Sequence, residues 1–172
     1  MIKERLIRPN GFHISEKAEQ YHGISNAIAE KEGGTLADVL TEFMSDVEAP
    51  CMSGATIVSH NLEFDAGIIM QEFMRCDLGQ FQTIWSEVIP KGFCTMDPEL
   101  GKWLCESSGL EEASTTRSNT MKFDQIVKAL IPMEQRSSLN LRAAGACAYL
   151  HVMLYQSLLR LKKGEQAILL AQ

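Results

Sequence analysis

The chain has 172 residues, of which 45% are hydrophobic, so it is long enough to bury the core of one globular domain. Its formal net charge of −6 provides no overall attraction to phosphate, so nucleic-acid binding would require a local basic patch. The five cysteines form no CxxC pair, which argues against a zinc site and is typical of reduced thiols in an intracellular protein.

The sequence has no segment typical of a membrane anchor or a signal peptide. The amino-terminal residues MIKERLIRPNGF lack an apolar core, and the longest apolar run, residues 143–159, is interrupted by His151, Gln156 and Ser157. We therefore expect a soluble, intracellular protein with no membrane partner. Its compartment stays open, because processing could have removed a transit segment from a longer precursor.

Short elements alternate with turns in the first part of the chain. Residues 4–14 combine a β-prone run with proline and glycine, which predicts a short strand entering a turn, followed by two brief helices. Thr35, with an acidic residue three positions later, predicts the start of a helix whose apolar face continues to residue 48. Residues 50–54 are then expected to form a loop, and the β-branched residues 55–60 a buried strand.

The next elements continue this alternation. A helix is expected over residues 62–75, and residues 92–96 form the second strand candidate. Pro98 is suited to the first turn of another helix. Residues 106–120 are rich in serine, threonine and glutamate, which predicts an exposed, mobile loop inside the domain.

Two helices complete the expected elements. One covers residues 122–130 and ends before Pro132, and a longer one covers about residues 140–162, where small side chains suit close packing against a sheet. The alternation of helices and strands, without an internal repeat, predicts a single α/β domain over residues 1–172 with helices flanking a mixed sheet.

Several short motifs follow one another in a fixed order through most of the chain. They are Ile7-Arg-Pro-Asn-Gly-Phe, His22-Gly-Ile-Ser, Thr35-Leu-Ala-Asp-Val-Leu, His60-Asn-Leu-Glu-Phe-Asp65, Cys94-Thr-Met and Met121-Lys-Phe-Asp-Gln-Ile. In order and spacing this series resembles the DEDDh-type 3′–5′ exonuclease superfamily, which includes ribonuclease-T-like and proofreading-exonuclease-like proteins. The resemblance implies a ribonuclease-H-like mixed sheet flanked by helices and, in active relatives, removal of nucleotides from a 3′ end.

The resemblance also implies a set of catalytic groups, most of which have no counterpart here. Active members use carboxylates to hold two magnesium or manganese ions and a histidine as the base. The chain begins at what resembles the family's third strand, so the first two strands and their DxE motif are missing. Asn140 occupies the position of the base, Gly145 occupies that of the last aspartate, and Asp65 alone is retained. One carboxylate cannot hold two such cations, so we expect no cofactor and no nuclease activity.

Three further residues of the second motif are candidate nucleic-acid contacts by their place in it: His60, Asn61 and Phe64. Each polar residue also has a structural alternative. Asn61 is a good helix N-cap, His60 could be a hydrogen-bonded turn residue, as could His22, and Asp65 could be favoured by the positive end of a helix dipole. The aromatic residues near the strands are expected in the core rather than stacked on bases: Phe81, Trp85, Phe93 and Trp103.

Three hypotheses for function remain open. The first is a catalytically degenerate exonuclease-like domain that acts as a binding or scaffolding module, and the negative charge favours a protein partner or self-association over nucleic acid. The alternative is an active metal-dependent 3′–5′ exonuclease whose missing strands and ligands come from another chain or from residues outside this sequence. The third is a gene fragment that folds only partly and melts without cooperativity.

Overall fold

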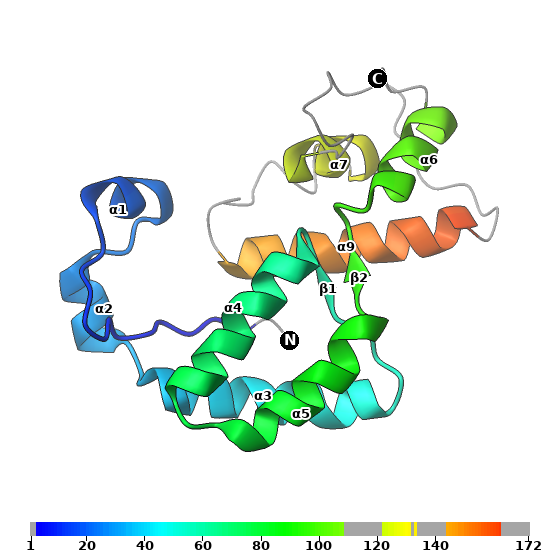
Figure 1. Cartoon of the computed structure of the whole chain (residues 1–172). Coiled ribbons are helices and arrows are strands. Elements are labelled where there is room, and N and C mark those ends of the chain that lie inside the picture. The colour runs from blue at the N-terminus through cyan, green and yellow to red at the C-terminus, as the bar shows by residue number, and fades with distance from the viewer. Residues whose placement is uncertain (1–2, 109–121, 132, 134–143, 163–172) are drawn as a thin grey trace. The chain divides into compact units, whose positions relative to one another are not determined.

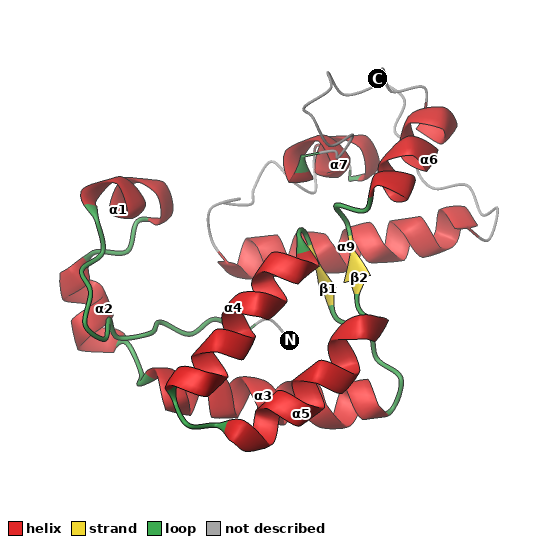
Figure 2. Cartoon of the chain, viewed as in Figure 1, coloured by secondary structure: helices red, strands yellow, loops and turns green. Residues whose placement is uncertain are grey.

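The computed structural model describes residues 3–108, 122–131, 133 and 144–162. These residues fall into two compact units: residues 3–57, 64–92 and 144–145 belong to the first, and residues 58–63, 93–108, 122–131, 133 and 146–162 to the second. Helices dominate, and the strands of the described residues form a two-stranded parallel sheet (Figures 1 and 2). The protein therefore belongs to the general α/β class.

The first unit is built around three helices that bury a common core. Its elements are α1 (Glu16–His22), α2 (Asn26–Glu32), α3 (Leu36–Met52), α4 (Leu62–Arg75, apart from its first two residues), α5 (Gly79–Val88) and the 3-10 helix η1 (Ile89–Lys91). The buried residues of the core come from α3, α4 and α5: Leu40, Met44, Ala66, Phe73, Trp85 and Val88. The Trp85 indole donates a hydrogen bond to the Ala66 carbonyl, so this aromatic belongs to the core, as expected.

The expected strand in residues 4–14 is reduced to one parallel bridge between Ile7 and Gly34. A Cβ atom at Gly33 would lie 2.5 Å from the Arg8 nitrogen and 2.8 Å from the Ile7 carbonyl carbon, so only glycine lets the two segments approach this closely. Ion pairs also join the amino-terminal segment to α3. The Arg5 guanidinium donates hydrogen bonds to the Glu42 carboxylate and holds its pKa below the usual range.

Helix α3 begins where the sequence predicts, with the Thr35 hydroxyl accepting from the Asp38 amide at 3.2 Å, but it ends later. It continues through Pro50 to Met52, so the loop expected at residues 50–54 was largely wrong. Because proline has no amide hydrogen, position 50 donates no backbone hydrogen bond in the last turn of α3. The chain leaves the helix through Gly54, whose φ is 96°.

The second unit contains the sheet and the carboxyl-terminal helices. Strands β1 (Val58–Ser59) and β2 (Phe93–Cys94) confirm the positions of both expected strands, although each has only two paired residues. Helices α6 (Pro98–Ser108), α7 (Phe123–Leu130) and α9 (Ala144–Lys162, apart from its first two residues) follow. Helix α6 extends into the expected loop at residues 106–120, and the rest of that loop lies outside the described residues.

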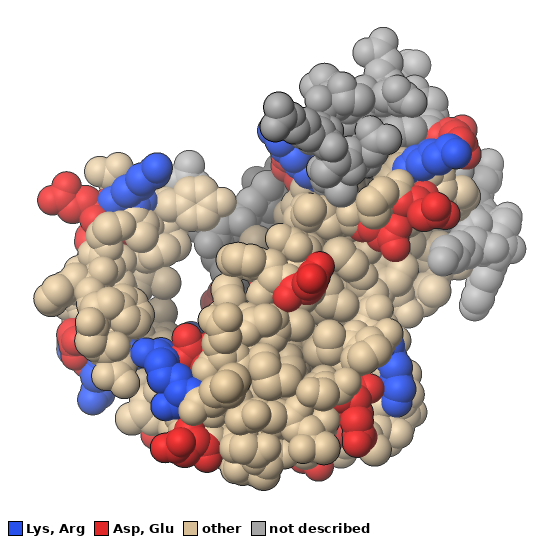
Figure 3. Space-filling model, in the orientation of Figure 1, with Lys and Arg blue, Asp and Glu red and all other residues tan. Residues whose placement is uncertain are grey.

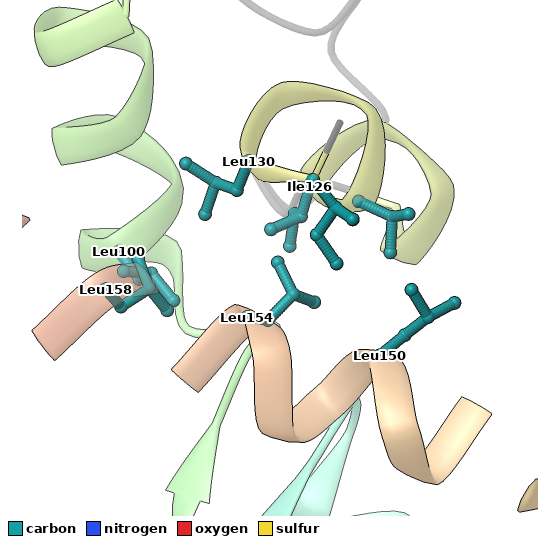
Figure 4. Packing of buried hydrophobic residues seen from close by; sticks show 8 residues of the cluster. Leu100, Ile126, Leu130, Leu150, Leu154 and Leu158 are labelled. Carbon is teal, nitrogen blue, oxygen red and sulfur yellow. The ribbon is translucent and has the colours of Figure 1, made fainter. Parts of the chain in front are cut away.

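One apolar cluster forms the core of the second unit (Figure 4). Leu150, Leu154 and Leu158 recur every four residues on α9, so they line one face of the helix. In Figure 4 Leu150 and Leu154 point towards α7, which contributes Ile126 and Leu130, and Leu158 lies beside Leu100 of α6. Phe93 and Trp103 pack against the same cluster, in agreement with their expected place in the core.

Helix α5 and the 3-10 helix that follows it were missed in the sequence. The signal was present, because Phe81, Ile84, Trp85 and Val88 recur at helical spacing. All four pack in the core of the first unit. Hydrophobic periodicity would therefore have found this element.

Candidate functional site

The second motif occupies the connection between β1 and α4. Strand β1 ends at Ser59, His60 and Asn61 form the turn, and α4 begins at Leu62 (Figure 1). Asn61 has a φ of 75°, a left-handed conformation that asparagine tolerates and that differs from the extended backbone of an ordinary N-cap. The Leu62 amide, which opens the helix, donates to the Cys94 sulfur at 3.5 Å. A residue of β2 thus satisfies a backbone group at the start of α4.

The His60 side chain is hydrogen-bonded within the second unit. Its Nδ1 lies 3.0 Å from the Thr95 hydroxyl oxygen, and that hydroxyl donates to the Ser59 carbonyl at 3.3 Å. Because the hydroxyl has only one proton to give, it accepts from His60, which places a proton on Nδ1. The geometry supports the structural alternative for His60, since this bond fixes the imidazole at the end of β1.

A second histidine approaches the same region through Phe123. The His60 and Phe123 rings lie 5.4 Å apart between centroids, and His151 stacks on Phe123 at 4.4 Å with an interplanar angle of 18°. His151 Nδ1 lies 2.7 Å from the Cys147 carbonyl, which can only accept, so Nδ1 is the donor. Burial raises the pKa of the Cys147 thiol. This ring cluster joins the motif turn to α7 and α9.

The remaining motif residues, Phe64 and Asp65, lie on α4 in the first unit. Phe64 is 60% exposed, whereas Asp65 is half-buried. Gly145 lies at the start of α9, also in the first unit, and Asn140 is outside the described residues. The structure therefore brings His60 and Asn61 together in one turn and assigns the candidate metal ligand Asp65 to the other unit.

Sequence reasoning missed the ring cluster because its members are far apart in the chain. His60, Phe123 and His151 come from a turn and two helices, and only the fold brings their rings into contact. The string Met121-Lys-Phe-Asp-Gln-Ile marked the segment that contains Phe123, although it gave no role to that ring. His151 had no local signal at all.

The described residues offer no group of three or more histidine, cysteine, aspartate or glutamate side chains that could hold a metal ion. Basic side chains do not gather on the face shown in Figure 3, where lysine and arginine are interspersed with acidic residues among those drawn in colour. Within the same part of the chain, we find no helix with the length and apolar character needed to cross a membrane.

The fold and the motif turn define an α/β protein in which a half-buried cluster of His60, Phe123 and His151 adjoins the turn between β1 and α4. No protein-family model matches the chain, and searches of curated proteins and of solved structures gave no significant match.

Proposed function

We propose that the protein is a catalytically degenerate exonuclease-like domain that acts as a binding or scaffolding module. The observation that carries the proposal is the context of the second motif: it follows a parallel strand and leads directly into α4. That is the context which the resemblance implies for this motif. The proposal includes a ribonuclease-H-like fold, in which β1 and β2 would form a small part of the sheet.

The chemistry of the family positions supports the loss of catalysis. Glycine at position 145 has no side chain to ligate a metal, and the Asn140 amide is not a base near neutral pH. The His60 imidazole, which could be considered as a substitute base, has Nδ1 hydrogen-bonded to Thr95 and its ring against Phe123. These contacts of His60 serve the fold, and Asp65 alone does not make a two-metal site.

The surface of α4 supports a protein partner more than nucleic acid. Phe64 and Ile68 are 60% and 44% exposed and lie four residues apart, on one face of the helix directly after the motif turn. Exposed apolar side chains of this kind favour contact with another protein, and the acidic net charge disfavours contact with phosphate. A second copy of this chain, bound through the same face of α4, would also be a protein partner.

One observation favours the alternative of an active exonuclease completed by another chain. The parallel pair β1–β2 has only two paired residues on each strand, whereas parallel sheets are ordinarily larger and covered on both faces. A strand from a second polypeptide would enlarge the sheet and could bring carboxylates with it. It would also have to supply a metal ligand in place of the aspartate whose family position Gly145 occupies.

A nuclease assay separates the two functions. The purified chain and an Asp65→Asn variant, which keeps the shape of the side chain but not its charge, are incubated with 3′-labelled single-stranded DNA or RNA in magnesium or manganese. We expect no metal-dependent release of label from either protein. Release that the substitution abolishes would overturn the proposal and support the active enzyme. A gel shift without release would identify nucleic acid as the partner, whereas no shift would favour a protein.

A further inference from the structure

The last residue of α1, His22, accepts a hydrogen bond from the backbone just beyond the helix. The Ile24 amide donates to His22 Nδ1 at 3.0 Å, and the bond is partly buried. A backbone amide can only donate, so Nδ1 must present a lone pair. His22 is therefore neutral in this structure, with its proton on Nε2.

This bond matters because no apolar core anchors the described residues of α1. The helix has no buried residue. Asn26, the first residue of α2, is bonded to Ile14, which precedes α1. The Asn26 side chain accepts from the Ile14 amide at 2.8 Å and donates to the Ile14 carbonyl at 2.9 Å. Between these points, the chain leaves α1 through Gly23, with a φ of 78°, and then through the amide of Ile24. The hydrogen bond between His22 and Ile24 fixes the backbone of this turn.

We propose that His22 is a pH-sensitive latch for the turn between α1 and α2. Histidine is the residue type whose charge changes near neutral pH. On His22 the position open to a second proton, which comes from water, is Nδ1. The imidazolium has two N–H donors and no acceptor, so the hydrogen bond from Ile24 breaks. The latch is closed at the higher pH and opens as the pH falls.

Nearby charges determine what happens to α1 when the latch opens. Apart from His22, the titratable and basic groups of residues 8–32, which include α1 and α2, are Arg8, His13, Glu16, Lys17, Glu19, Tyr21, Glu30, Lys31 and Glu32. Glu19 lies one turn before His22 on the same helix, and the helix carboxyl terminus also favours a positive charge. A positive charge on His22 is therefore stabilised at the carboxyl end of α1. The helix stays folded while the turn after it is released.

Nuclear magnetic resonance tests the latch in the whole chain. Nitrogen chemical shifts should show the Nε2–H tautomer of His22 at pH 7.5. Solvent exchange of the Ile24 amide, corrected for its intrinsic pH dependence, should become about two- to tenfold faster relative to that reference at pH 5. The Ile14 amide is the internal control, because its acceptor on Asn26 does not titrate and its corrected exchange should not change.

Two variants complete the test. In His22→Asn the side-chain oxygen takes the place of Nδ1 without titrating, so protection of Ile24 should be independent of pH. In His22→Ala the protection should be lost at both pH values. The proposal is wrong if His22 is the Nδ1–H tautomer at pH 7.5, if Ile24 and Ile14 respond alike, or if His22→Asn keeps the pH dependence.

Discussion

At the scale of single residues, Thr95 joins the His60 side chain to the end of β1. It is 1% exposed, and its hydroxyl both accepts from His60 and donates to the Ser59 carbonyl. Replacement by valine keeps the shape of the side chain but removes both hydrogen bonds inside the protein. We expect Thr95→Val to lower the free energy of unfolding by about 1–2 kcal/mol, measured by urea denaturation.

The matched control for this prediction is Thr95→Ser, which keeps the hydroxyl and loses one methyl group. It should cost about 1 kcal/mol or less and should leave the His60 tautomer unchanged. A valine variant as stable as the original protein would show that the hydrogen bonds at the end of β1 add nothing to stability. The role assigned to His60 would then have no energetic support.

At the scale of elements, α9 shows how packing selects one face of a helix that is apolar almost all round. Leu154 is fully buried, whereas Val152, two residues earlier, is 53% exposed. We expect Leu154→Ala to lower the free energy of unfolding by about 2–5 kcal/mol, because it leaves a cavity between α7 and α9. Val152→Ala on the same helix should change it by about 0.5 kcal/mol or less. Urea denaturation followed by circular dichroism compares the two, and equal losses would contradict the packing.

Elements with local signals could be predicted from the sequence, and those that depend on distant residues could not. The bounds of α4 and the cap of α3 follow from periodicity and from Thr35, and both are confirmed. The extent of β1 and β2 depends on backbone pairing across the sheet, so two short paired segments replaced the longer expected strands. The contact of Phe123 with two histidines likewise required the fold.

At the scale of the whole molecule, the prediction of one domain depends on how two compact units respond to unfolding. Each unit has its own apolar core. The division does not follow the sequence, however, because α4 and α9 each contribute residues to both units. Separate domains are ordinarily joined by exposed linkers rather than by continuous helices. This connectivity favours a single cooperative unit.

The two tryptophans report on the two cores separately and can test this prediction. Trp85 is buried in the first unit, and Trp103 packs against the core of the second. In Trp103→Phe and Trp85→Phe, fluorescence follows one core alone, whereas circular dichroism follows all the helices. If the chain is one domain, both methods should give the same urea midpoint within each variant. Different midpoints would show two domains, and a broad transition without a baseline would favour a chain that folds only in part.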